Sequence, residues 1–245
     1  MSLLERIEAV LDAPQLASEI AGLEARLAIG VRPRQCSART LLIGMHLCLG
    51  SGHQSAQLTA VHAALCGLEP AEKERLGVVV TWKSGPHTLT YRQVTYTTER
   101  LWAALQKDRP DGAPSDLLQG LCDALIEGSV PARYKGASSS YAIDWTDVAS
   151  FSRPPSDKEG PCADPEAAFG HRRGDGPGQR DELFFGYYAS VMTMVRSEHG
   201  GAVPELIRRV QLASCRHDPV PGFVAVVTRS AASGVVVHEV LADSG

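Results

Sequence analysis

The chain has 245 residues, of which 44% are hydrophobic and 21% are charged. These fractions are ordinary for a folded globular protein and argue against intrinsic disorder. The formal net charge of −4 lacks the basic excess that is usual for a freestanding nucleic-acid-binding protein. The length allows one large domain, or a small helical domain followed by a sheet domain.

The sequence shows no sign of export or of membrane insertion. The first residues carry acidic side chains, and no long apolar run leads to a small-residue cleavage site. The longest apolar run, near residues 41 to 49, is too short to cross a bilayer. The six cysteines include no Cys-x-x-Cys pair, so we expect them to be reduced and mostly in the core. These features predict a cytoplasmic protein with no membrane partner.

The first part of the chain, residues 1 to 136, is predicted to be a helical region. Apolar side chains recur every three or four positions over residues 3 to 28, where Pro14 separates two helices. The same periodicity predicts further helices over residues 38–49, 55–68, from about 90 onward, and 114–127.

The predicted helix that begins near Thr90 carries side chains that can reach DNA. Tyr91, Arg92 and Gln93, with Arg100, could form one exposed face that contacts bases and phosphates. A plain amphipathic packing helix accounts for the same pattern at least as well. The tryptophans are expected in the core rather than on such a face: Trp82, Trp102 and Trp145.

A change in composition at residues 136 to 140 marks a second region, residues 137 to 245, with a mixed α/β pattern. Strands, one helix and a final strand are predicted in the order 141–147, 183–195, 207–214, 223–232 and 235–242. Residues 152 to 182 are rich in Pro, Gly and charge and are predicted to form a long surface loop. Within it, Arg172 and Arg173 could contact DNA phosphates or simply remain solvated.

Two aspartates in this region are candidate metal ligands. Asp144 lies inside an apolar strand and Asp243 follows another, and a divalent cation would neutralise carboxylates in such places. If three strands form an antiparallel meander and the fourth returns through the helix beside the first, the two aspartates become neighbours. Carboxylate oxygens suit Mg²⁺ or Mn²⁺, which can promote attack on a phosphodiester. The alternative for each is an ordinary turn or capping residue, and Asp147 is a substitute ligand.

Several segments, taken in order, resemble the DDE transposases of bacterial insertion sequences. The segment Ala142-Ile-Asp144-Trp-Thr-Asp147 resembles their first-aspartate strand, and Val240-Leu-Ala-Asp243-Ser-Gly245 their second-aspartate strand. Between these, residues 164–170 and 184–188 resemble the second-strand region, and residues 216–218 the segment after the third strand. The ordered series covers about residues 137 to 245.

The resemblance implies an RNase H-like catalytic domain and DNA transposition by metal-dependent phosphodiester hydrolysis and strand transfer. Asp144 and Asp243 would then be catalytic residues that hold Mg²⁺ or Mn²⁺, and the helical region would recognise double-stranded DNA at transposon ends. The family's third acid, a glutamate, would follow Asp243 further along the chain. Asp243 lies two residues before the last residue of the given sequence. An incomplete catalytic domain with little or no strand-transfer activity is therefore expected.

The same resemblance leaves residues 235 to 241 as an exposed apolar edge strand, prone to pairing with another chain in a homo-oligomer. Two other interpretations stay open at this point. One is a non-catalytic DNA-binding remnant of a transposase that acts through residues 1 to 135. The other is an unrelated α/β protein in which the aspartates are structural.

Overall fold

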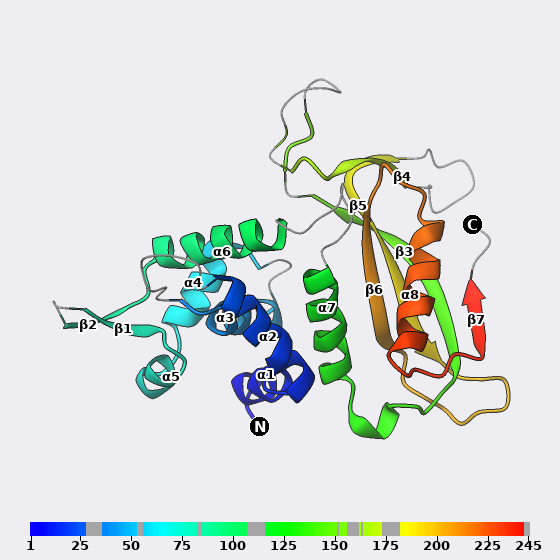
Figure 1. Cartoon of the computed structure of the whole chain (residues 1–245), viewed down its shortest axis with the longest axis horizontal. Coiled ribbons are helices and arrows are strands. Elements are labelled where there is room, and N and C mark those ends of the chain that lie inside the picture. The colour runs from blue at the N-terminus through cyan, green and yellow to red at the C-terminus, as the bar shows by residue number, and fades with distance from the viewer. Residues whose placement is uncertain are drawn as a thin grey trace. The chain divides into compact units, whose positions relative to one another are not determined.

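The computed structural model describes residues 1–27, 36–52, 56–82, 85–106, 116–150, 152–155, 162, 164–172 and 182–242. The chain divides into two compact units, Met1–Arg109 with Ser115–Gly128 (the helical unit) and Pro110–Pro114 with Ser129–Gly245 (the sheet unit). Helices precede a mixed five-stranded sheet with a C-terminal helix, which is the predicted α plus α/β fold class (Figure 1). No helix among these described ranges is long and apolar enough to cross a membrane.

The helical unit contains helices and one hairpin, with these bounds: α1 (Leu3–Leu11), α2 (Pro14–Leu27), α3 (Ala38–Gly50), α4 (Leu58–Cys66), α5 (Pro70–Arg75), β1 (Val79–Trp82), β2 (Gly85–Thr88), α6 (Tyr91–Gln106) and α7 (Asp116–Ser129). Local sequence explains several helix starts. Ser2 and Glu5 form a capping box at α1, and Pro14 is the first residue of α2. The hairpin β1–β2 was not predicted, because its strands are only four residues long.

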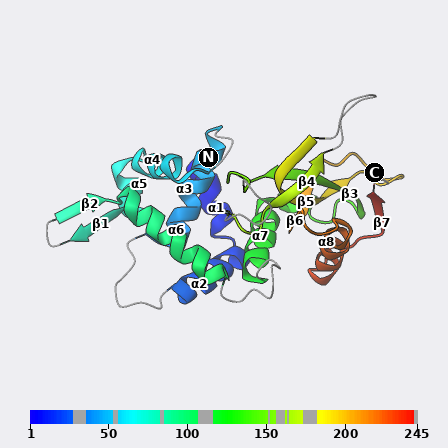
Figure 2. The same ribbon diagram turned by 90° about the horizontal axis from the view of Figure 1, so that it is seen from above.

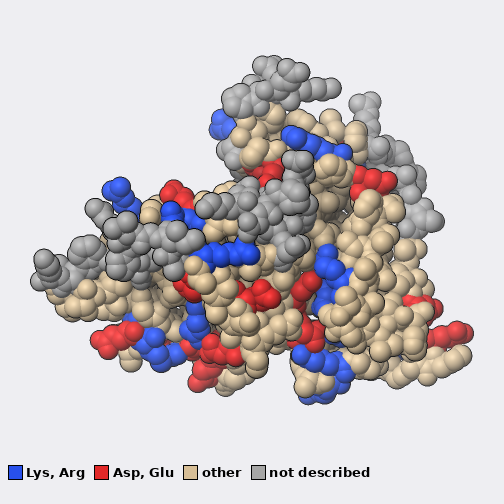
Figure 3. Space-filling model, viewed as in Figure 1, with Lys and Arg blue, Asp and Glu red and all other residues tan. Residues whose placement is uncertain are grey.

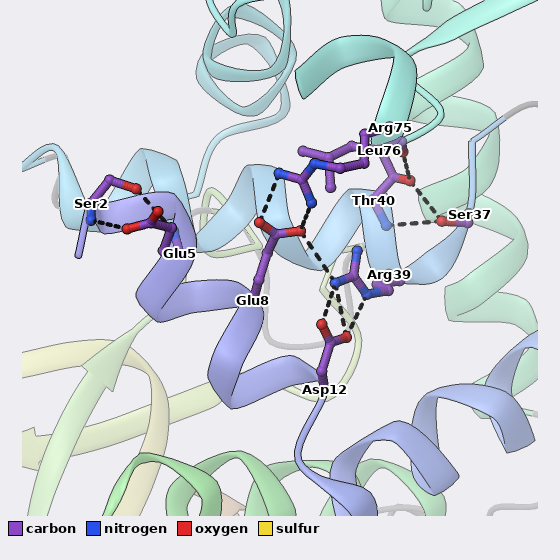
Figure 4. A network of polar contacts seen from close by, with 9 residues as sticks. All are labelled: Ser2, Glu5, Glu8, Asp12, Ser37, Arg39, Thr40, Arg75 and Leu76. Carbon is purple, nitrogen blue, oxygen red and sulfur yellow. Dashed lines mark hydrogen bonds and ion pairs between the residues drawn. The ribbon is translucent and has the colours of Figure 1, made fainter. Parts of the chain in front are cut away.

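The helical unit is built around one apolar core, and its outer surface carries a polar network between three helices (Figure 4). Glu8 of α1 accepts hydrogen bonds from Arg75 of α5, one of them at 2.9 Å, and lies 3.5 Å from Arg39 of α3. Arg39 also donates to both carboxylate oxygens of Asp12, at 3.0 and 2.9 Å. The network therefore joins helices that are far apart in sequence.

The sheet unit begins with a short 3-10 helix, η1 (Ala132–Tyr134), and continues with elements of these bounds: β3 (Ser140–Ala149), β4 (Ala168–Arg172), β5 (Glu182–Val195), β6 (Leu206–Ser214), α8 (Val220–Ala232) and β7 (Glu239–Ala242). Strand β5 pairs antiparallel with β3 and with β6, and β7 lies parallel beside β3. The predicted meander with a parallel fourth strand is confirmed.

Helix α8 packs on one face of this sheet, as Figures 1 and 2 show from two directions. The core beneath it is formed by alternate residues of β3 and β5 together with one residue of the helix: Tyr141, Ile143, Met192, Met194 and Val226. Because side chains alternate along a strand, the residues between these positions face the other side of the sheet.

Two predictions about this unit are corrected. The predicted loop over residues 152 to 182 contains β4, which pairs antiparallel with the first residues of β5. Its strand pattern is only five residues long and lies among turn-forming residues, so the composition of the segment hid it. The last strand is shorter than predicted, because residues 235 to 238 lie outside β7 and Val235 and Val237 pack against the core instead.

Candidate functional site

Asp144 lies in the middle of β3, between Ile143 and Trp145. Its neighbour Ile143 belongs to the core under α8, so the Asp144 carboxylate faces the opposite side of the sheet. The side chain is exposed, and its Oδ1 accepts a hydrogen bond from the backbone N–H of Trp145 at 2.7 Å. Asp144 is therefore exposed within its strand rather than buried among the apolar residues that flank it in the sequence. The turn-capping alternative is wrong, because the residue lies within a strand.

Asp243 lies outside the described residues, but the strand that leads to it is described. The parallel register pairs Ser140 with Glu239 and ends with Ile143 opposite Ala242. In the sequence, each residue of this last pair is followed by an aspartate, namely Asp144 and Asp243. The structure thus aligns the two strands at the residues that immediately precede both predicted metal ligands.

Asp147, the substitute ligand, is already engaged. Arg172 of β4 donates from its Nε to Asp147 Oδ2 at 2.8 Å and also through Nη2 to the same oxygen. This guanidinium holds the pKa of Asp147 below its ordinary value, while partial burial opposes the shift. A carboxylate held in this way is a poorer metal ligand than the exposed carboxylate of Asp144.

The same pair changes the interpretation of Arg172 as a DNA contact. Its guanidinium lies on Asp147, 4.0 Å from Glu182 and over the ring of Phe184 at 5.9 Å. Arg172 therefore bridges β4 to β3 rather than standing free for a phosphate. Arg173 lies outside the described residues.

A different aspartate, Asp164, has a structural role in the segment that resembles the family's second-strand region. It accepts hydrogen bonds from the hydroxyls of Ser150 at 2.6 Å and Tyr187 at 2.5 Å. These bonds tie the connection between β3 and β4 to β5. Among the described residues, no three His, Cys, Asp or Glu side chains come together as a metal cluster.

The predicted DNA-contacting side chains of helix α6 have different roles in the structure. Tyr91 and Arg92 are exposed, and the Tyr91 ring meets His62 edge-on with the ring centroids 6.0 Å apart. Gln93 instead caps the helix, because its Oε1 accepts from the N–H and the hydroxyl of Thr90 at 2.6 and 2.9 Å.

Sequence reasoning missed two members of the exposed face of α6. Tyr96 is 53% exposed and Trp102 is 52% exposed, although Trp102 was expected in the core. Trp145 of β3 is 37% exposed as well, with its ring edge-on to Tyr188. Helical spacing could have predicted part of this exposure. Val94 and Leu101 mark the apolar side of α6, and Tyr96 and Trp102 lie on other sides of the helix.

The electrostatics of the helical unit are mixed rather than basic. On the face drawn in Figure 3, Lys and Arg side chains of the described residues are interspersed with Asp and Glu. In the network of Figure 4, the positive charges of Arg39 and Arg75 are opposed by Glu8 and Asp12. Attraction of nucleic acid to this surface would depend on individual side chains rather than on a broad positive field.

Comparison with known proteins adds no relative. No family model matches the chain, and no curated protein or solved structure matches it significantly.

Proposed function

We propose that the sheet unit is an RNase H-like metal-dependent nuclease domain of the DDE transposase type. In this proposal Asp144 and Asp243 are two of its metal ligands. The reaction class is phosphodiester hydrolysis and strand transfer on double-stranded DNA at transposon ends, in the cytoplasm. The observation that carries the proposal is the register of β3 and β7, which ends one residue before each aspartate.

The strand order supports this assignment. Along the sheet, β6, β5, β3 and β7 are neighbours in that order, and β3 pairs antiparallel with β5 and parallel with β7. The connection from β6 to β7 runs through α8, so the chain crosses over to the far side of β3 before its last strand. Such a crossover brings the carboxyl end of β7 beside the middle of β3, at the residue before Asp144.

The available side chains fit a hard divalent cation only in part. Asp144 supplies accessible carboxylate oxygens, which are the ligands that Mg²⁺ and Mn²⁺ prefer. Asp243 would supply the second carboxylate, and Asp147 is withheld by Arg172. A bound cation of this kind activates a hydroxyl nucleophile and stabilises the leaving oxygen of a phosphodiester. Two carboxylates by themselves hold such a cation weakly, so the test measures binding at millimolar as well as lower Mn²⁺ concentrations.

Mn²⁺ titration followed by paramagnetic broadening of backbone amide signals tests the site. We expect broadening to centre on Ile143 and Trp145. The affinity for Mn²⁺ should fall at least about tenfold in Asp144→Asn, since a ligand oxygen is lost. Asp147→Asn is the matched control, on the same strand but not a ligand in the proposal, and should retain the affinity. Equal binding by Asp144→Asn and the unaltered chain, or no binding by the unaltered chain, would reject the metal site.

A second candidate function is DNA binding without cleavage. The exposed face of α6 favours it, because Tyr91, Arg92, Tyr96 and Trp102 offer aromatic and cationic side chains to a partner. Sequence-selective retention of a duplex by the chain, lost in Arg92→Ala with Trp102→Ala and accompanied by no cutting with Mg²⁺, would favour this function over the nuclease. Absence of both DNA binding and any metal response would leave an α/β protein with structural aspartates.

A further inference from the structure

Strand β7 is weakly held in the sheet. Its register with β3 comprises four residue pairs, from Ser140 opposite Glu239 to Ile143 opposite Ala242, and all four β7 residues are exposed. A strand whose register is not dictated by burial is prone to slip along its neighbour. The sequence around it does not choose a register either, because residues 235–237 and 240–241 are all apolar.

One side-chain contact distinguishes this register from its alternatives. The hydroxyl of Ser140 donates to Oε2 of Glu239 at 2.8 Å, across the first pair of the parallel ladder. Just before this pair, the backbone N–H of His238 donates to the carbonyl oxygen of Ser139 at 2.9 Å. Ser140 is only 2% exposed, whereas Glu239 reaches it from the surface.

The burial of Ser140 makes this contact selective. A slip of β7 by two residues, which preserves the faces of the strand, would put Val237 or Leu241 opposite Ser140 in place of Glu239. Neither aliphatic side chain can accept the hydroxyl proton, so a buried donor would lose its partner. A hydrogen bond to a carboxylate is also stronger than one between neutral groups.

We propose that Glu239 is a positioning residue, which fixes the register of β7 beside β3 through its hydrogen bond to Ser140 and so holds Ala242, the residue before Asp243, opposite Ile143. A two-residue slip moves one strand by about 6.6 Å along the other. Oxygens that share one Mg²⁺ each lie about 2.1 Å from it, so such a slip separates the two carboxylates. The metal consequence rests on the proposed function, but the register lock does not.

Disulfide trapping measures the register directly, without metal. Ala142 and Leu241 are register partners, so Ala142→Cys with Leu241→Cys should cross-link on mild oxidation, with the bond mapped by mass spectrometry. Adding Glu239→Ala should lower the cross-linked fraction about tenfold at early times, the ratio expected for one charge-assisted hydrogen bond. Glu239→Gln, whose amide oxygen still accepts from Ser140, should restore it.

Ser140→Ala removes the same hydrogen bond from the other strand and keeps the carboxylate. It should reduce cross-linking as much as Glu239→Ala does, and the two changes together should cost no more than either alone. Far-ultraviolet circular dichroism confirms that each variant is folded. Equal cross-linking in the Glu239→Ala, Glu239→Gln and unaltered backgrounds would overturn the proposal.

A parallel Mn²⁺ titration separates the register lock from the proposed function. If Glu239→Ala weakens both cross-linking and Mn²⁺ affinity and Glu239→Gln restores both, the lock and its metal role stand together. If cross-linking depends on Glu239 while no variant binds Mn²⁺, the lock stands and the metal site fails. If Mn²⁺ binds equally in all backgrounds despite lost cross-linking, Glu239 has no role in positioning the ligands.

Discussion

Arg172 and Asp147 form an ion pair across β5, although their register partners on that strand, Glu182 and Tyr188, are six positions apart. In a straight strand, six residues span about 20 Å, more than an arginine side chain can bridge. The sheet must therefore curve sharply between these positions, and this curvature brings β4 towards β3.

Gly186 lies where this curvature is needed, and we expect Gly186→Ala to destabilise the fold by about 2–3 kcal/mol. A Cβ at this position would overlap the carbonyl oxygen of Val148 and approach the N–H of Ser150 to 2.9 Å, and backbone atoms cannot move away cheaply. Urea unfolding measures the loss. Gly201→Ala is the control, because a Cβ there meets nothing within 4 Å, and an equal effect of the two substitutions would contradict the argument.

The Asp147–Arg172 pair predicts a pKa change that can be measured residue by residue. In Arg172→Ala, the pKa of Asp147 should rise towards its ordinary value, because the guanidinium that stabilises the charged carboxylate is gone. Carboxyl carbon chemical shifts across a pH titration report this change. An unchanged titration of Asp147 would show that the pair is absent in solution.

The network around Glu8 predicts a pH-dependent stability. Hydrogen bonding from Arg75 holds the pKa of Glu8 below its ordinary value. A pKa lower in the folded than in the unfolded chain contributes stability that is complete above the unfolded pKa and is lost as the pH falls through the folded pKa. Between about pH 6 and pH 3, the unaltered chain should therefore lose roughly 1 kcal/mol more unfolding free energy than Glu8→Gln. Parallel pH profiles of the two proteins would contradict this expectation.

The thiol of Cys215 is predicted to react slowly with alkylating reagents. Burial raises its pKa to about 11, and the negative charge of Asp147 adds to the shift. At pH 8 only about one thiol in a thousand is then ionised, so alkylation should be slow. Asp147→Asn should accelerate it by removing the repelling charge, and peptide mapping after iodoacetamide treatment measures both rates. Rapid labelling of Cys215 at pH 8 in the unaltered chain would disagree with this environment.

The succession of elements was accessible from sequence because it rests on local patterns. Alternating and continuous apolar runs predicted the strands, and three-to-four spacing predicted the helices. Strand β4 and the hairpin β1–β2 escaped, because segments of four or five residues carry too little periodicity.

The sequence by itself determined the fold class, the succession of elements and the two strands that lead to Asp144 and Asp243. Only the tertiary structure decided which side chains are free to act. It exposed Asp144 and Trp102, engaged Asp147 with Arg172, and turned Gln93 into a helix cap. Periodicity is a property of neighbouring residues, whereas the exposure of Asp144 and Trp102 and the pairing of Asp147 depend on residues brought together from distant parts of the chain.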